Sequence, residues 1–259
     1  MTIRIPRLRA LLVLTLLLTL VLTACGKKGP VRPLQKPLPA AAQNLTLEQK
    51  GERFLLSWEL PKKNQDGSEL KDLAAFDVLR MEYDPTQDCP ECKDTSTLLT
   101  HIELDYLRGA TRRGNRLFLW DWGLESGTGY RYTVVPVTEQ GHTGLAARVE
   151  QPAVKAPAAP VGVVAKGLDQ QVRLTWEETV MAGPDCDLLG YNVFRRREAG
   201  SFLGAPVNKQ LLVSPRFDDF GLENGVTYRY QLRSVAMKGG VTVESAPSET
   251  VEAVPKAGR

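Results

Sequence analysis

The chain has 259 residues, of which 33 are Lys or Arg and 30 are Asp or Glu, so its formal net charge is +3. Three of the basic residues, Arg4, Arg7 and Arg9, precede an apolar run near the N-terminus, and without them the two signs of charge are equal in number. A basic face is the usual footprint of a nucleic-acid-binding protein. The balanced charge therefore excludes nucleic acid as an expected partner.

The first 24 residues have the pattern of an export signal that ends at a cysteine. Basic residues lead into the apolar run 11–22, which is followed by Thr23, Ala24 and Cys25. Such a run suits a secretory signal of roughly 7 to 15 apolar residues, whereas a membrane-spanning helix needs about 20. The segment resembles a bacterial lipoprotein signal, which implies cleavage before Cys25 and acyl chains on that cysteine. A plain membrane anchor, or a cleaved signal with an incidental cysteine, is the alternative.

Residues 25–42 are rich in proline and alanine and lack an apolar period. Spaced prolines favour extended polyproline-type backbone of about 3.1 Å per residue, so this segment predicts a tether of at most about 55 Å. Gly26 follows the cysteine in place of the aspartate that retains such lipoproteins at the inner membrane. The resemblance therefore implies a lipid-anchored protein of the outer membrane, on its periplasmic side or its surface.

The residues around the predicted anchor carry a second resemblance. The sequence from Cys25 to Pro30 reads CGKKGP. It is similar to the start of the small LptM-type outer-membrane lipoproteins, which have Cys-Gly-x-Lys-Gly-Pro and associate with the lipopolysaccharide-inserting translocon. This resemblance covers six residues, and those proteins have no large domains.

The rest of the chain contains an internal repeat. The sequence DWGLESGTGYRY at 121–132 aligns without gaps on DFGLENGVTYRY at 219–230, a shift of 98 positions. Two shorter matches lie upstream: 56–58 with 174–176, and 76–80 with 191–195. The repeat predicts two successive units at 43–153 and 157–255, with a proline- and alanine-rich boundary around 151–160.

Each unit is predicted to be an all-β sandwich. Alternation of apolar residues with a period of two indicates half-buried strands, and it occurs in both units at equivalent places: Phe54, Leu56 and Trp58, and Val172, Leu174 and Trp176. Turn residues separate such runs, and no long apolar stripe has helical spacing.

An early tryptophan, a leucine-glycine corner and a tyrosine six residues after the leucine form the layout of the tyrosine corner. In this layout both units resemble the fibronectin type III family. The resemblance assigns three pairs of residues to core positions: Trp58 and Trp176, Leu124 and Leu222, and Tyr130 and Tyr228.

The first unit carries an insertion of about 20 residues, because Trp58 and Tyr130 are 72 positions apart whereas Trp176 and Tyr228 are 52 apart. The pair Cys89 and Cys92 lies within that excess. In an oxidising envelope compartment the favoured interpretation is a local disulfide that stiffens a loop.

The sequence gives less support to two other roles for Cys89 and Cys92. A redox site would need a helix N-terminus to lower the thiol pKa, and a zinc site would need two more ligands with paired spacing. The remaining cysteine, Cys186, is expected in a loop, either sheltered or available for an intermolecular bridge.

Catalysis finds little support in the sequence. The two histidines are far apart, and His142 lies in a predicted turn. Asp218 and Asp219 are adjacent and would point to opposite faces of a strand; Asp219, which matches Asp121 of the first unit, is predicted to cap a turn. A glycine-rich phosphate loop followed by a helix is also missing. We therefore expect no enzyme, no metal and no cofactor.

Two tryptophans are the candidate binding residues. In the aligned units Leu119 matches Phe217 as an inward residue, which places Trp120 on the outer face, and Trp122 follows two positions later. An exposed tryptophan often anchors a protein interface or a sugar ring. The alternative is that residues of the insertion cover Trp120.

Two functional hypotheses follow from these features. The first is a membrane-anchored scaffold or adhesion module that binds an envelope protein or glycan through its sandwiches. The second is an accessory of an outer-membrane assembly machine that acts through its lipidated N-terminus.

Overall fold

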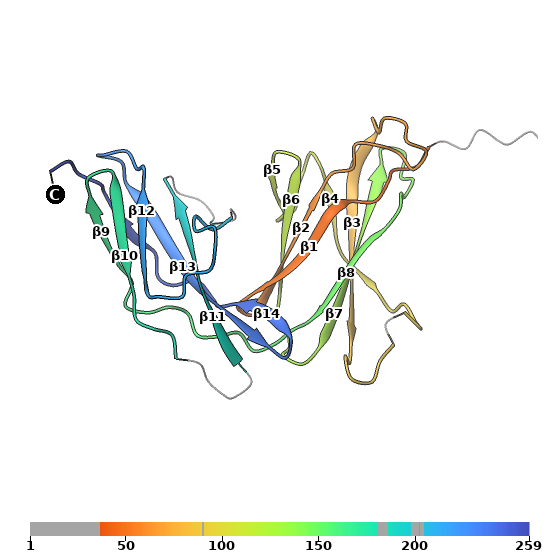
Figure 1. The fold of residues 1–259 in the computed structure, drawn as a ribbon. Coiled ribbons are helices and arrows are strands. Elements are labelled where there is room, and N and C mark those ends of the chain that lie inside the picture. The colour runs from red at the N-terminus through yellow and green to blue at the C-terminus, as the bar shows by residue number, and fades with distance from the viewer. Residues whose placement is uncertain (1–36, 90, 181–185, 198–201, 203–204, 259) are drawn as a thin grey trace, which may run out of the picture. The chain divides into compact units, whose positions relative to one another are not determined.

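The computed structural model describes residues 37–89, 91–180, 186–197, 202 and 205–258, and every regular element among them is a β-strand (Figure 1). Within that part of the chain, no helix has the length and apolar character that a membrane crossing requires. The predicted signal 1–24 and Cys25 lie outside the described residues. The prediction of an all-β fold is confirmed for the part that is described.

The strands fall into two successive groups, which lie inside the predicted ranges 43–153 and 157–255. The first sandwich comprises β1 (Gln43–Lys50), β2 (Arg53–Glu59), β3 (Leu73–Tyr83), β4 (Thr97–Glu103), β5 (Thr111–Arg113), β6 (Arg116–Trp122), β7 (Gly129–Thr138) and β8 (Ala147–Pro152). The second sandwich comprises β9 (Val164–Leu168), β10 (Gln171–Thr175), β11 (Cys186–Arg196), β12 (Arg216–Phe220), β13 (Tyr228–Lys238), β14 (Val241–Glu244) and β15 (Val251–Ala253).

In each group the chain alternates between two sheets. The first sandwich pairs the order β1-β2-β6-β5 with the order β4-β3-β7-β8. The second pairs β12-β10-β9 with a sheet in which β13 lies between β11 and the strands β14 and β15. These are the two tandem fibronectin type III-like sandwiches that the repeat predicts.

The core of the first sandwich is built from the alternating residues of β2. Phe54, Leu56 and Trp58 have no exposed surface, and the Trp58 ring meets Phe76 of the opposite sheet edge to face, with centroids 5.7 Å apart. Burial of one such side chain stabilises the fold by about 1.5–3 kcal/mol. The predicted core position of Trp58 is therefore confirmed.

The second sandwich repeats this core with its own residues. Val172, Leu174 and Trp176 of the β10 region are buried, and the Trp176 ring lies 5.2 Å from that of Tyr191 on the opposite sheet. The two cores are separate clusters of buried residues. The duplication in the sequence is thus a duplication of the core.

Both tyrosine corners are present. The Tyr130 hydroxyl oxygen accepts a hydrogen bond from the backbone N–H of Glu125 at 2.9 Å, and Tyr228 does the same for Glu223 at 3.0 Å. Leu222 is buried in its core, whereas Leu124 is half-buried against the first core. The layout predicted from the repeat is confirmed in both sandwiches.

The role predicted for Asp219 is wrong. It does not cap a turn, because β12 continues to Phe220 and directs the Asp219 side chain inward. Both carboxylate oxygens accept hydrogen bonds from Arg195 Nη1 at 2.8 Å, and one also accepts from the Tyr230 hydroxyl at 2.9 Å. A buried carboxylate needs such partners to offset the loss of hydration. Asp219 therefore links the two sheets of the second sandwich.

The first sandwich contains the same inter-sheet link at the aligned positions. Asp121 is buried, accepts hydrogen bonds from Arg80 Nη1 at 3.1 and 3.2 Å, and accepts another from the Tyr132 hydroxyl at 2.5 Å. Its carboxylate also accepts from the backbone N–H of Trp122 at 3.0 Å. An Asp–Arg–Tyr set is thus a second shared feature of the two units.

One sheet runs through both sandwiches. The end of β1 pairs in parallel with the end of β14, so that Gln49 lies opposite Val243 and Lys50 opposite Glu244 (Figure 1). The Gly51 N–H donates to the Glu244 carbonyl at 2.8 Å, and the Lys50 ammonium lies 2.8 Å from the Glu244 carboxylate. The strands of the two repeats are therefore joined by backbone pairing as well as by the chain.

The predicted boundary around 151–160 is also held by side chains. The Gln49 amide donates to the Val154 carbonyl at 2.5 Å and accepts from the Val154 N–H at 2.9 Å. From the second sandwich, the Ser234 hydroxyl donates to the Ala158 carbonyl at 2.6 Å. The segment at the predicted boundary is therefore hydrogen-bonded to both sandwiches.

The predicted tether, 25–42, is too long at its C-terminal end. Ala42 is buried in the first core, the Ala40 N–H donates to the Lys63 carbonyl at 3.1 Å, and the Pro39 carbonyl accepts from Leu145 at 3.0 Å. Proline is tolerated here because it lies beside the sheet rather than within a central strand. Residues 38–42 thus belong to the first sandwich.

Candidate functional site

The two candidate tryptophans lie on the outward register of β6. Leu117, Leu119 and Asp121 alternate with them and are buried, because successive residues of a strand point to opposite faces. Trp122 is 61% exposed, which is unusual for so large an apolar side chain, and Trp120 is half-buried. The structure therefore places both indoles on the outer face of the β1-β2-β6-β5 sheet.

An arginine that the sequence analysis did not single out lies over both indoles. Arg53, the first residue of β2, is directly opposite Trp122 in the ladder. Its guanidinium carbon is 4.2 Å from the centre of the Trp122 ring and 4.8 Å from that of Trp120. Each such cation–π contact stabilises the pair by about 0.5–1 kcal/mol at an exposed site. We call Arg53, Trp120 and Trp122 the Arg53 cluster.

The guanidinium of Arg53 has no ion-pair partner among the described residues. Within the same part of the chain the Arg53 side chain also forms no hydrogen bond, although Arg80 and Arg195 each bind an aspartate. Partial burial lowers the pKa of Arg53 from its ordinary value, yet an arginine remains charged at neutral pH. The two rings thus hold a charged guanidinium group whose N–H donors are still available to a ligand.

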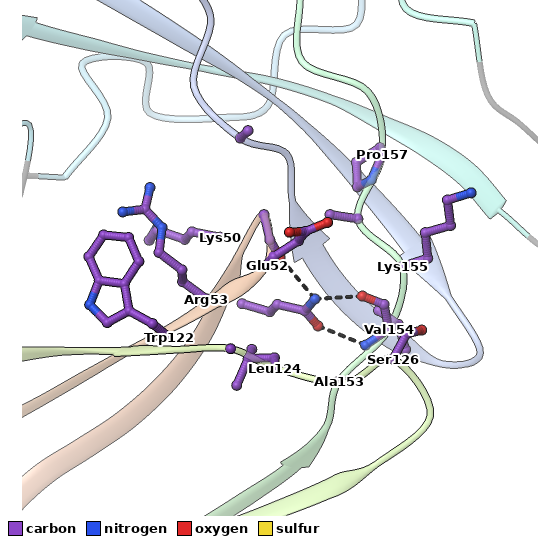
Figure 2. A pocket seen from close by; sticks show the side chains of 15 residues that line it. Lys50, Glu52, Arg53, Trp122, Leu124, Ser126, Ala153, Val154, Lys155 and Pro157 are labelled. Carbon is purple, nitrogen blue, oxygen red and sulfur yellow. Dashed lines mark hydrogen bonds between the residues drawn. The ribbon is translucent and has the colours of Figure 1, made fainter.

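Figure 2 shows the groove that the Arg53 cluster borders. Arg53 and Trp122 run alongside each other at one end, close to Lys50, and the connection that contains Val154 and Lys155 forms the other end. Gln49 also lines the groove, and its side-chain amide is hydrogen-bonded to the backbone of Val154. The groove is therefore formed by the first sandwich, by the segment that leaves it and, at Ala246, by the second sandwich.

A second groove lies on the other side of Lys50, along the same outer sheet face. From the first sandwich, Leu55, Phe118 and Trp120 line it, and from the second sandwich Phe194 and Arg233 do so. Leu55 and Phe194 are nearly fully buried. The outward-facing Leu55 of β2 is thus buried because the second sandwich covers this part of the face.

Charges between the two grooves are arranged around a single carboxylate. Glu244 binds Lys50 at 2.8 Å, accepts from the Asn192 amide at 2.7 Å and lies 3.7 Å from the Arg233 guanidinium. Burial lowers the pKa of Arg233; the charge of Glu244 raises it, and the charge of Arg53 lowers it again. The two guanidinium groups are therefore near enough to repel each other.

The candidate disulfide lies elsewhere. Cys89 and Cys92 are bonded, with an S–S distance of 2.07 Å, in the connection between β3 and β4 of the opposite sheet. Glu91 of this loop binds Arg131 at 2.7 Å. Among the described residues, neither groove is lined by this loop. The structure therefore does not bring the cysteine pair together with Trp120, and what half-covers Trp120 is Arg53.

Cys186 differs from its predicted setting. It begins strand β11, where it pairs with Lys238, and its thiol is half-buried and unbonded. The expectation of a loop position is therefore corrected.

The histidines are remote from both grooves. His101 Nδ1 lies 2.5 Å from the Asp77 carboxylate on the β3–β4 pair, and His142 is in the turn after β7. In the described part of the chain, no three His, Cys, Asp or Glu side chains gather as metal ligands would. The grooves present cationic, aromatic and amide groups together with the carboxylates of Glu48, Glu52 and Glu244, a chemistry that suits binding.

Comparison with known proteins finds no matching family model and no matching curated protein. Among solved structures, the chain is similar to the FN1–FN3 domains of chicken CNTN1, with 12% identity, 85% of this chain and 69% of that chain covered, and a TM-score of 0.34. It is also similar to a structure described as a myokine, with 17% identity, 39% of this chain and 100% of that chain covered, and a TM-score of 0.31.

The sequence does contain one signal for the Arg53 cluster, which is a difference between the outward residues of the two repeats. In the aligned repeats Arg53 corresponds to Gln171, Leu55 to Arg173 and Trp120 to Asp218. The inward residues match between the units, whereas these outward residues do not. A comparison of the repeats for outward differences would have identified Arg53 together with Trp120.

Proposed function

We propose that this chain is a non-enzymatic binding protein of the bacterial envelope, held at the outer membrane by lipid on Cys25, which binds an envelope protein or glycan through the Arg53 cluster. The observation that carries the proposal is the Arg53 guanidinium, which contacts two indoles at an exposed sheet face and has no carboxylate partner among the residues that the structure describes. Aromatic and arginine side chains of this kind are enriched among the residues that dominate binding energy.

The anchor rests on the sequence of residues 1–25. Insertion of an acyl chain contributes about 0.8 kcal/mol per buried methylene, and two or more chains hold a protein stably at a membrane. Labelling of cells with a radioactive fatty acid tests this step. Wild type should incorporate label and Cys25→Ala should not; equal label in both would contradict the anchor.

The position of the cluster suits a partner away from the anchored end. The chain enters the first sandwich at residues 37–42, before the start of β1, and Lys50 lies at the other end of that strand. Eight residues of strand at about 3.3 Å each separate the two ends by about 26 Å. Because Arg53 and Lys50 line the same groove, the Arg53 cluster lies near the end of β1 that is opposite the tether attachment.

Capture of partners from intact envelopes tests the binding role. Wild type, Trp122→Ala and a matched control, Phe220→Ala, would be cross-linked in cells and the captured partners compared by mass spectrometry. Phe220 is the aligned residue of the second sandwich and is 68% exposed, so it removes a similar area. We expect Trp122→Ala to lose partners that Phe220→Ala keeps; identical capture by all three would contradict the proposal.

The resemblance of residues 25–30 to LptM-type lipoproteins favours a second candidate function, that of an accessory to an outer-membrane assembly machine. This role would depend on the lipidated N-terminus rather than on the sandwiches. Deletion of 26–34 separates the two functions, since it should abolish capture of the assembly machine and leave capture through the Arg53 cluster intact.

A further inference from the structure

The Arg53 guanidinium is an available anion-binding group. An arginine has five N–H donors in a planar fork that matches a carboxylate or a phosphate. The guanidinium contacts the Trp120 and Trp122 rings, and none of its N–H donors has a hydrogen-bond partner among the described residues. The two rings also restrict the side chain, so that less conformational freedom is lost when an anion binds.

The second sandwich shows how such an arginine is normally neutralised. Asp218 occupies the position aligned with Trp120, and its carboxylate accepts hydrogen bonds from Arg173 at 2.7 Å and from Arg216 at 2.9 Å. In the first sandwich an indole replaces that carboxylate. The residue aligned with Arg53 is Gln171, whose amide also donates to Asp218 at 2.7 Å. Among the described residues no carboxylate pairs with Arg53, so an anion at this place would come from a ligand.

A second cation, Arg233, makes the electrostatic potential at the same place more positive. Arg233 is 8% exposed, and in the described part of the chain Glu244, at 3.7 Å, is its only carboxylate partner. That carboxylate already binds Lys50 and Asn192. The charge of Arg53 is one of the causes that lower the pKa of Arg233, so an anion beside Arg53 would relieve repulsion between the two guanidinium groups.

The side chains of the Arg53 cluster suit a ring compound. The Trp122 indole is flat and 61% exposed, and the Arg53 guanidinium lies beside it. β5 pairs with β6 only as far as Phe118, so the backbone of β6 beyond that residue is unpaired on that side. A peptide that extends the sheet at this edge is therefore the alternative that a peptide probe must test.

We propose that the Arg53 cluster is the receptor for an acidic saccharide, whose carboxylate or phosphate binds Arg53 while its sugar ring packs on Trp122. This inference rests on the binding role proposed above and names the class of ligand for the same site. The non-polar face of a sugar ring suits an indole, and the charge-assisted hydrogen bonds fix its orientation.

Titration calorimetry with the full-length lipidated protein in detergent tests the proposal. The probes are a galacturonate oligosaccharide, its neutral methyl ester, glucose 1-phosphate and a glutamate-rich peptide. The variants are Arg53→Gln, which introduces the residue of the aligned position in the second sandwich, Trp120→Asp, which supplies the missing carboxylate internally, and the control Arg173→Gln. Thermal melts establish that each variant is folded.

We expect the galacturonate or the phosphate to bind and the methyl ester to bind at least tenfold more weakly. Which acidic probe binds distinguishes a carboxylate from a phosphate ligand. Because hydrogen bonds to charged groups contribute about 1.5–3 kcal/mol, Arg53→Gln should weaken binding about tenfold or more, and Trp120→Asp should do likewise. Arg173→Gln should leave it unchanged.

Three results would overturn the inference: equal affinity for the acid and its ester, preference for the glutamate-rich peptide, or full binding by Arg53→Gln. Its failure is distinguishable from failure of the binding role. If Trp122→Ala loses envelope partners but no acidic saccharide binds, only the ligand class is wrong. If Trp122→Ala captures every partner, the binding role itself fails.

Discussion

The two sandwiches share their interiors and differ on their outer faces. Each has a buried tryptophan, a tyrosine corner and an Asp–Arg–Tyr link between its sheets. On the outer face of the second sandwich, hydrogen bonds from Arg173 and Arg216 lower the pKa of Asp218 although burial raises it. The corresponding face of the first sandwich has the Arg53 cluster instead.

This difference shows that inward and outward residues of the repeated fold are under different physical constraints. Residues that face inward must fill the same space and satisfy the same polar groups in both copies, so they stay alike. Residues that face outward affect stability little, since most exposed substitutions change it by within about 0.5 kcal/mol. The outer face is therefore where a function specific to the first sandwich can be read.

The largest effect should come from the shared cores. Trp58→Ala and Trp176→Ala each remove a buried ring and should lower the free energy of unfolding by about 3–5 kcal/mol, from a typical 5–15 for a domain. Urea unfolding followed by circular dichroism measures both. Trp122→Ala is the matched control, with an expected loss of about 0.5–1 kcal/mol from its contact with Arg53. A small loss for either core variant would mean that the two interiors are not equivalent.

An intermediate effect should come from the inter-sheet links. Asp219→Asn leaves Arg195 without a carboxylate, but the arginine side chain is 32% exposed and can recover some hydration. We therefore expect a loss of about 1–3 kcal/mol rather than the full cost of an unpaired buried charge. Asp121→Asn, beside Arg80, should behave alike in the same urea measurement. A loss in only one sandwich would show that the link has diverged.

The smallest effect should appear only in alkaline solution. Burial, together with the neighbouring aspartate, raises the pKa of Tyr132 and of Tyr230. The folded state thus keeps both phenols neutral above pH about 10, where the unfolded chain releases their protons. Stability is complete below that pH and falls as the pH rises beyond it.

Comparison of urea midpoints at pH 8 and pH 11 measures this dependence. Tyr132→Phe and Tyr230→Phe should each reduce the decline, and by similar amounts. An unchanged decline in either variant would show that its phenol ionises equally in the two states.

The sequence predicted the interior of the molecule well, because alternation and the repeat both report on burial. Trp58, Trp176 and the two tyrosine corners were predicted from those patterns alone. Asp219 was misinterpreted because its position before a corner suits a turn cap, and the arginine that binds it lies 24 positions away. Long-range polar pairs leave no local pattern.

Only part of the candidate site could be predicted from the sequence. The outward register of Trp120 follows from the alternation of β6. Arg53 could not be assigned to it, because cross-strand neighbours depend on the pairing of β2 with β6 rather than on sequence spacing. Likewise, no periodicity indicates that Gln49 binds Val154 or that residues 38–42 join the first sandwich.

The parallel pairing of β1 with β14 also protects two sheet edges. Unpaired strand edges are templates for association between chains, and proteins usually cover them. Here the last residues of β1 cover β14 and are covered by it. Separation of the sandwiches would uncover both edges at once, so an isolated second sandwich would offer Val243 and Glu244 to another copy of itself. The pairing of the two sandwiches thus hinders association between copies of the chain.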